Sequence, residues 1–253
     1  VRSFVTTWNI TSYNKFASEQ SLARYSPYAF EPSVGYDPTR GGSAPYPLEP
    51  TPKDSYFLTP LAGKEPATDS ASAATAMSTG FKTDEGNLAW LPNDPPGGAM
   101  VSISDRLRAE RGFAIGVVST APFSHATPAG FASHNVDRFN YLDIAKEIAE
   151  VVKPDVVIGG GHPAWSNTTF TDAATLDGLR TSTEYIFTER RANVDGSVAI
   201  GAAAAEAVTK HKKLFGVFGG TDGSFDHQVP SHAPGSPSVA RGSLENPTLA
   251  AAA

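Results

Sequence analysis

Two adjacent residues, Asp69 and Ser70, begin a run of small residues that could place a nucleophile at the start of a helix. The run "ATDSASAATAMSTG", residues 67–80, consists almost entirely of Ala, Ser and Thr. At a helix start, backbone N–H groups and the positive end of the helix dipole stabilise an anion, so a phosphoserine formed at Ser70 would be electrostatically supported. In the alternative interpretation, Thr68, Asp69 and Ser70 only cap the helix.

A second segment, "STAPFSHATPAGFASHNVDR", follows a predicted strand that ends near Val118 and carries His125, Thr127 and Arg138. Ligand-binding groups in α/β proteins gather beyond the carboxyl ends of strands. The planar guanidinium of Arg138 would bind a phosphate through two parallel hydrogen bonds. Taken alone, Arg138 would instead be a surface helix residue paired with Asp137, and His125 a loop histidine.

Helices alternate with apolar strands in the part of the sequence that must position these residues. Hydrophobic periodicity and terminal glycines predict helices over 70–81, 100–112, 141–152 and 197–211, with a short one in "ATPAGFASH". Apolar runs predict buried strands over 113–120, 154–161 and 213–220. Helix followed by apolar strand, three times over, indicates an α/β fold with a mostly parallel central sheet covered by helices on both faces.

The two ends of the chain and one long internal segment lie outside this pattern. Residues 1–10 could form a strand, and residues 27–66 hold nine of the twenty prolines, which predicts a long surface excursion. The Pro-, Gly- and Ser-rich tail 222–245 predicts a loop, and Asn246 would cap a helix just beginning. Both ends look cut, so we interpret residues 1–253 as a single partial domain.

Composition excludes several classes of function. The net charge is −6 and no basic cluster is large enough to form a nucleic-acid-binding face. The absence of cysteine excludes disulfides, thiolate chemistry and cysteine-based zinc sites. No apolar run approaches the roughly 18 residues of a transmembrane helix, so no membrane span is predicted.

Four segments, in order, resemble the alkaline phosphatases. The segments "TDSASAATAMSTGFKTDEGNLAW" and "GVVSTAPFSHATPAGFASHNVDR" are similar to the nucleophile and arginine segments of that family, and "PDVVIGGGHPAW" and "KLFGVFGG" to two of its later strands. The resemblance covers residues 67–220, with weaker similarity in the Pro-rich part. It implies a three-layer sandwich and a metal-dependent phosphomonoesterase that releases inorganic phosphate and an alcohol.

The resemblance also implies a role for each candidate residue. Ser70 matches the serine that attacks phosphorus, and Asp69 matches the acid that steadies the phosphate-binding arginine, Arg138. Thr127 matches a magnesium ligand, and His125 stands where members of the family carry an acid or a histidine beside that site. A histidine there would weaken magnesium ligation, since magnesium prefers oxygen donors. The implied reaction is a double displacement in which two zinc ions activate the serine and then a water.

The sequence departs from the family in its metal ligands. No "GDGMG"-like turn precedes the nucleophile, and the nearest candidate for the later zinc pair, "DGSFDHQVP", has Pro230 where a histidine is needed. We therefore interpret Asp226 and His227 as loop residues, and we assign structural roles to His134, His162, His211 and His232. The chain resembles the middle half of an alkaline phosphatase, and this fragment alone is expected to be inactive.

Other functions remain open as alternatives. The main one is a relative of the family that binds phosphate or a partner without turnover. A serine hydrolase would need G-x-S-x-G, which is absent. The "GGGHPA" at residues 159–164 fits a dinucleotide-binding turn, but "WSNTTFTD" after it is not a helix start. A homodimer and a periplasmic or secreted location are implied by the resemblance only.

Overall fold

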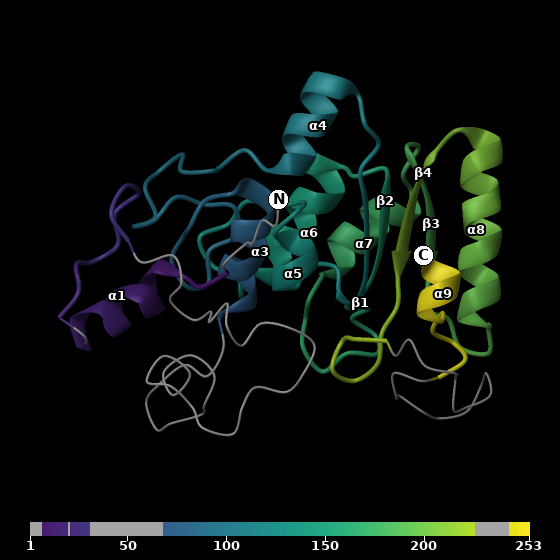
Figure 1. Cartoon of the computed structure of the whole chain (residues 1–253). Helices are drawn as coiled ribbons and strands as arrows, with labels where there is room; N and C mark the ends of the chain where they lie inside the picture. Colours follow the sequence, from purple (N-terminus) through teal and green to yellow (C-terminus); the bar gives the residue numbers. More distant parts are fainter. Residues whose placement is uncertain (1–6, 20, 31–67, 226–242) are drawn as a thin grey trace.

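The computed structural model describes residues 7–19, 21–30, 68–225 and 243–253, and it contains a four-stranded sheet (Figure 1). The strands are β1 (Gly116–Pro122), β2 (Val156–Gly160), β3 (Tyr185–Glu189) and β4 (Lys213–Val217). They lie in the order β1-β2-β4-β3, and every neighbouring pair is parallel. Val157 of β2 lies opposite Val117 of β1 and Phe215 of β4. The predicted parallel sheet is therefore confirmed.

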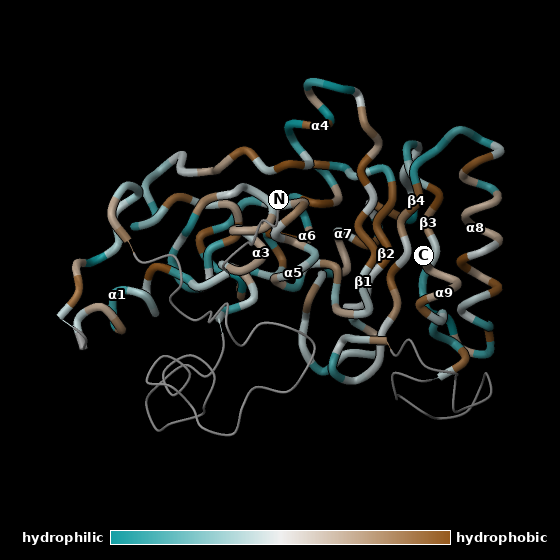
Figure 2. Tube along the Cα trace, viewed as in Figure 1, coloured by the Kyte–Doolittle hydropathy of each residue, from teal (hydrophilic) through white to brown (hydrophobic). Residues whose placement is uncertain are grey.

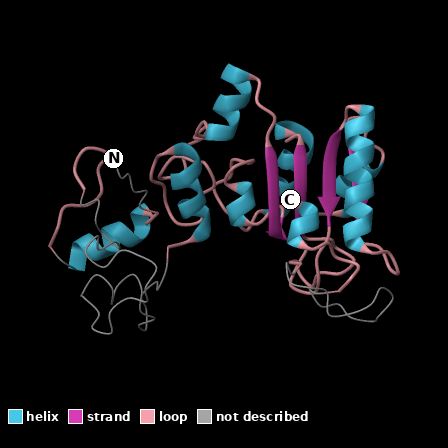
Figure 3. Ribbon diagram, turned by 45° about the vertical axis from the view of Figure 1, so that its right-hand side comes forward, coloured by secondary structure: helices cyan, strands magenta, loops and turns pink. Residues whose placement is uncertain are grey.

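Helices cover both faces of this sheet, which confirms the three-layer arrangement. On one face, Val157 and Phe215 pack against α5 (Ala126–Ala129), α6 (Tyr141–Lys146), the π-helix η1 (Glu147–Val152) and α7 (Ala173–Arg180). On the other, Ile158 and Leu214 pack against α8 (Gly196–Lys210) and α9 (Leu249–Ala252). Neighbouring residues of a strand face opposite sides of the sheet, so two apolar residues in succession contribute one side chain to the core on each face. Figure 2 shows hydrophobic residues along the strands, and Figure 3 shows the strands between helices.

Helix α3 (Ser70–Thr79) packs closely against α5, because small residues lie at the contact. A Cβ built on Gly130, at the end of α5, would lie 2.5 Å from the Cβ of Ala74, so only glycine allows this approach. The run of small residues therefore brings α3 against α5 directly, and α5 in turn covers the sheet. Gly80 ends α3 in the left-handed conformation, at φ 79°, as its position in the sequence predicts.

The prediction of a strand at the N-terminus is wrong for its described part, since residues 7–9 form no strand and α1 (Ile10–Glu19) begins at Ile10. The Asn9 side chain accepts a hydrogen bond from Ser12 N at 2.6 Å, which caps this helix. Tyr13 and Phe16, spaced as on one helix face, are buried with Trp8. The buried aromatic residues of this segment are spaced as on a helix and do not alternate with polar residues as in a strand, so the segment forms a helix.

The other predicted helices and strands are observed, with two additions. The prediction that the first strand is buried is wrong, because β1 lies at the edge of the sheet and most of its residues are exposed or half-exposed. Helix α4 (Ile103–Arg111) ends at Gly112, and the helix predicted over 141–152 is present as α6 followed by η1. The sequence reading missed β3 and the preceding α7. Asp172 begins α7 by accepting a hydrogen bond from Thr175 N at 2.7 Å.

Near the C-terminus, α9 begins two residues later than predicted. Its N-cap is Thr248, and the side chain of Asn246 instead accepts a hydrogen bond from Gly219 N at 2.9 Å. The Asn246 cap prediction is therefore wrong, because a tertiary contact takes its side chain. Of the Pro-rich excursion only residues 27–30 are described, and Asp226, His227 and His232 lie outside the described residues. None of the helices in the described ranges is long and apolar enough to cross a membrane.

Candidate active site

Ser70 is the first residue of α3, and the residue before it supplies the helix cap. Asp69 Oδ2 accepts hydrogen bonds from Ala71 N and Ser72 N, each at 3.0 Å. The Ser70 hydroxyl takes no part in this cap, and its oxygen instead accepts a hydrogen bond from Arg138 Nη1 at 2.7 Å. Asp69 therefore supplies the cap, and the Ser70 hydroxyl is left for another role.

Arg138 approaches this helix start from a loop between α5 and α6. Its Nη1 donates to Asp69 Oδ1 at 2.5 Å as well as to Ser70, and its Nη2 contacts His125 Nε2 at 3.2 Å. The Arg138 side chain is only 13% exposed. The interpretation of Arg138 as a surface helix residue paired with Asp137 is therefore wrong, since the guanidinium is buried against Asp69 instead. Asp137 turns back and accepts a hydrogen bond from Phe139 N.

The Asp69 carboxylate is held in its ionised form. Burial by itself would raise its pKa, but hydrogen bonds from Ser72, Arg138 and Gly86, together with the Arg138 charge, lower the pKa below its ordinary value. An ionised Asp69 beside a charged Arg138 forms a fixed ion pair. The ion pair restrains the guanidinium at the Ser70 hydroxyl.

His125 lies on the other side of the guanidinium. Burial lowers the pKa of His125, and the nearby Arg138 charge lowers it further, while Asp69 acts in the opposite direction. A neutral ring can accept the hydrogen bond that Arg138 Nη2 donates to Nε2. The ring stacks on Tyr141 at 6.3 Å between centroids and meets the edge of Phe170 at 6.4 Å.

Backbone hydrogen bonds tie the Arg138 loop to the segment that follows α3. Leu88 and Asn135 exchange two backbone hydrogen bonds, both at 2.8 Å, and Arg138 N donates to Gly86 O at 2.9 Å. Gly86 N in turn donates to Asp69 Oδ2 at 3.1 Å. One short segment, residues 86–88, therefore connects the cap of α3 to the loop that carries the arginine.

A serine at a helix start, in contact with an arginine that is paired with an aspartate, is the arrangement that the resemblance in the sequence predicts. The family model for alkaline phosphatase matches residues 54–243, which is most of the chain. The chain belongs to the alkaline phosphatase family.

Individual alkaline phosphatases and related enzymes are similar to part of the chain. Alkaline phosphatase 3 of Bacillus subtilis (strain 168) is 38% identical over 124 residues, which cover 45% of this chain and 26% of that protein. Streptomycin-6-phosphate phosphatase of Streptomyces griseus is 33% identical over 119 residues, 40% of this chain and 26% of that protein. The solved alkaline phosphatase of Thermus thermophilus is 28% identical, with a TM-score of 0.44, over 62% of this chain and 29% of that one. The chain thus matches about a quarter of the length of these curated relatives.

Of the five site residues that the alkaline phosphatase resemblance indicates, the structure brings four together and leaves one apart. Asp69, Ser70, His125 and Arg138 are joined by hydrogen bonds. Thr127 is exposed and lines a hollow beside β1 with Val117 and Ser119. His125 is the N-cap of α5 and has an extended backbone, at φ −74° and ψ 158°, whereas Thr127 lies within the helix.

The described residues do not form an alkaline phosphatase metal site. Among them, no group of three or more His, Asp or Glu side chains is close enough to hold a metal ion. Asp69 and His125 already contact Arg138, and Thr127 lies apart. This donor set does not fit two zinc ions, which take three or four protein ligands each, or magnesium, which takes oxygen ligands.

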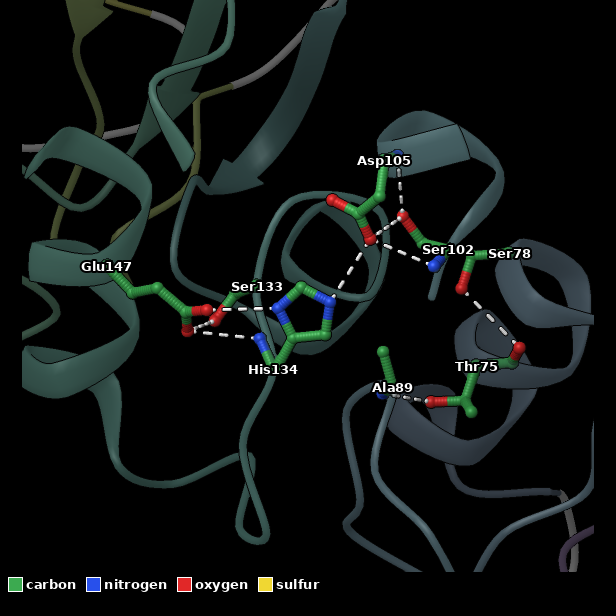
Figure 4. A network of polar contacts seen from close by, with 8 residues as sticks. All are labelled: Thr75, Ser78, Ala89, Ser102, Asp105, Ser133, His134 and Glu147. Atoms are coloured by element: carbon green, nitrogen blue, oxygen red, sulfur yellow. Dashed lines mark hydrogen bonds and ion pairs between the residues drawn. The ribbon is translucent and has the colours of Figure 1, made fainter. Parts of the chain in front are cut away.

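His134, four residues before Arg138, fastens the arginine loop to two helices (Figure 4). Its Nδ1 lies 3.0 Å from Glu147 Oε1 of η1, and its Nε2 lies 3.2 Å from Asp105 Oδ2 of α4. Hydrogen bonds to Asp105 and Glu147 raise the pKa of His134 to about 9, against the opposing effect of burial. Burial favours a higher pKa for Asp105, but hydrogen bonds from His134 and Ser102 lower that pKa to about 2. At neutral pH a cationic ring therefore bridges two carboxylates.

Replacing His134 by glutamine is expected to destabilise the protein at pH 6 and much less at pH 10. The raised pKa means that the contribution of His134 is complete below 6.5, and is lost as pH rises through about 9. After allowance for partial exposure we expect on the order of 1–2 kcal/mol at pH 6, or a Tm lower by about 3–6 °C. Thermal unfolding at both pH values measures it.

The matched control is His211→Asn, because His211 is the left-handed C-cap of α8 and asparagine accepts that conformation. This variant should keep the wild-type dependence of Tm on pH. An equal loss at pH 6 and pH 10 in His134→Gln would contradict an ionic role for His134.

Of the remaining histidines in the described ranges, His162 has a side-chain partner and His211 is the left-handed C-cap of α8. His162 is 5% exposed and its Nε2 lies 3.1 Å from Glu189 Oε2. The residues that sequence reasoning missed are the aromatic ones around His125, namely Phe139, Tyr141 and Phe170. Phe139 and Tyr141 follow the arginine in "DRFNY", which was the available signal.

Proposed function

We propose that this member of the alkaline phosphatase family hydrolyses phosphomonoesters through a phosphoserine at Ser70. The observation that carries the proposal is the 2.7 Å contact from Arg138 Nη1 to Ser70 Oγ, with Asp69 and His125 fixing the guanidinium. Helix α3 directs the positive end of its dipole toward the same hydroxyl. A serine without a phosphate-binding role has no need of this arrangement.

In the first step, Ser70 Oγ would attack phosphorus as the bond from phosphorus to the alcohol oxygen breaks. The serine hydroxyl loses its proton, the departing oxygen gains one, and the product is a phosphoserine and a free alcohol. In the second step, water attacks the same phosphorus, the bond to Ser70 Oγ breaks, and inorganic phosphate leaves. Each step passes through a transition state with charge on the equatorial oxygens.

Arg138 would bind that charge. A phosphoryl group on Ser70 Oγ lies beside Nη1, so it receives a charge-assisted hydrogen bond in place of the contact to the free hydroxyl. The Arg138 Nε is buried and has no hydrogen-bond partner among the described residues. Nη2 carries two N–H donors and contacts His125 with one of them, so a phosphate oxygen could use the other.

Zinc and magnesium belong to this proposal through the family. Two zinc ions and a magnesium would lower the pKa of the serine hydroxyl and stabilise the leaving oxygen when bound. The described residues do not form their site, so the remaining ligands would have to come from residues other than the described ones. Secretion and a homodimer likewise remain predictions from the family.

The second candidate function is phosphate binding without turnover. It is favoured by the lack of a three-ligand group among the described residues, and it is disfavoured by the contact of Ser70 with Arg138. The two functions share phosphate binding and differ in whether the ester bond is broken.

The test is turnover of 4-nitrophenyl phosphate by the complete natural polypeptide, purified with zinc and magnesium. We expect many equivalents of phosphate and nitrophenol per protein, with competitive inhibition by inorganic phosphate. Phosphate binding without release of nitrophenol would support the binding protein instead. The same assay on residues 1–253 alone tests the expected inactivity of the fragment.

A further inference from the structure

We propose that Phe139, supported by Tyr141, forms a subsite for an aromatic leaving group, so that aryl phosphomonoesters are favoured substrates. The inference rests on the proposed function, because it assigns the surface on which the alcohol part of the ester would lie. Neither Phe139 nor Tyr141 takes part in the capping, the ion pair or the phosphate contact described above.

Phe139 lies beside the guanidinium that contacts the Ser70 hydroxyl. Its ring centroid is 5.4 Å from Cζ of Arg138, whose Nη1 contacts Ser70 Oγ at 2.7 Å. An aryl ester carries its ring one oxygen away from phosphorus, and the bond to that oxygen breaks as the bond from Ser70 Oγ forms. The departing ring, on the side of phosphorus opposite to Oγ, would then lie against Phe139. A bare phosphate ion makes no use of the same surface.

Phe139 is 66% exposed, whereas Phe170, on the other side of Tyr141, is 6% exposed. Exposing a phenylalanine leaves a large apolar area in water, and covering that area with another ring is favourable. Arg138 lies over one side of the ring. The exposed remainder of the ring is the surface that an aryl group would cover.

The backbone turn and the neighbouring rings hold Phe139 in place. Phe139 N donates to Asp137 Oδ1 at 2.9 Å, and Asn140 N donates to Asp137 O at 3.1 Å. The ring meets Tyr141 edge to face at 6.1 Å. Tyr141 in turn packs against Phe170, which is 6% exposed, at 4.7 Å. Because these contacts already hold the Phe139 ring, little conformational entropy would be lost from that side chain when a ligand ring binds to it.

The test compares inhibition constants of phenylphosphonate, methylphosphonate and inorganic phosphate on the complete natural polypeptide. Phosphonates carry no cleavable ester, so leaving-group reactivity does not affect the comparison. We expect wild type to bind phenylphosphonate more tightly than methylphosphonate. Phe139→Ala should reduce that preference by about three- to tenfold, the range of an aromatic pair, with inorganic phosphate inhibition unchanged within about twofold.

Phe139→Leu, which keeps an apolar side chain without the ring, should give an intermediate preference. The matched control is Phe81→Ala, since Phe81 is equally exposed at 67% but follows the far end of α3. An unchanged phenyl preference in both Phe139 variants, with phosphate still inhibiting, would overturn the subsite and leave the proposed function intact. If inorganic phosphate did not inhibit the wild-type protein competitively, both the subsite and the proposed function would be overturned.

Discussion

Replacing Ser70 by alanine is expected to lower kcat of the complete natural polypeptide by on the order of 10⁴-fold or more, the range seen when a covalent nucleophile is removed. The substitution removes the oxygen that would form the bond to phosphorus. Asp69 would still cap α3 through Ala71 N and Ser72 N, so the helix and the fold should persist. Steady-state turnover of 4-nitrophenyl phosphate measures the effect, and thermal unfolding verifies the fold.

The matched control for this variant is Ser78→Ala. Ser78 is in the last turn of the same helix, is buried, and makes only a 3.4 Å hydrogen bond to Thr75 O. Removal of the Ser78 hydroxyl should change kcat by no more than about twofold, because the substitution alters packing at a distance from the site. Ser70→Ala with turnover close to that of Ser78→Ala would show that Ser70 is not the nucleophile.

The second large effect is expected at Arg138. Arg138→Ala should lower kcat/KM by on the order of 10²–10³-fold, as for removal of a fixed donor to a charged transition state. Arg138→Lys should recover only part of this loss. A lysine ammonium is a point charge and cannot contact Asp69, Ser70 and His125 in the same planar arrangement. The measurements are kcat/KM and the inhibition constant of inorganic phosphate, which should rise in parallel.

Arg191→Ala serves as the matched control, because the Arg191 side chain is 64% exposed and its ion pair with Glu189 is long, at 3.8 Å. Its kcat/KM should stay within about twofold of wild type. An Arg138→Lys variant as active as wild type would mean that charge alone is sufficient, and that the geometry set by Asp69 and His125 has no catalytic role.

Local signals in the sequence were enough to predict the two ends of α3, whereas its place in the site was indicated by the family resemblance. Asp69 is a good N-cap, Gly80 is a good C-cap, and the residues between them are small, so both ends and the close packing follow from neighbouring residues. The sheet was predictable for the same reason, since β2 and β4 lie in apolar runs and so does the first part of β1.

Features set by distant contacts could not be predicted from the residues alone. The burial of Arg138 depends on Asp69, 69 positions earlier in the chain, and only the family resemblance indicated that pair. Asn246 is a good capping residue, but Gly219 N takes its side chain. A polar side chain can make a local capping hydrogen bond or a hydrogen bond to a distant residue with similar free energy, so the tertiary structure determines which one forms.

The positions of the aromatic residues around the site could not be predicted from the sequence either. Phe139 and Tyr141 are ordinary residues in sequence, and their importance depends on how the turn at Asp137 presents them beside Arg138. Thr127 lines the hollow beside β1, and its role as a magnesium ligand stays a prediction from the family resemblance.

The most direct test of the account is to find where phosphate is bound during turnover. The complete natural polypeptide should be mixed with substrate, quenched in acid, digested and analysed by peptide mass spectrometry. We predict one added phosphoryl group on the peptide that contains α3, located at Ser70 and not at Ser72. Turnover with the phosphoryl group on another residue, or with no covalent phosphate in Ser70 peptides at any quench time and pH, would contradict the account.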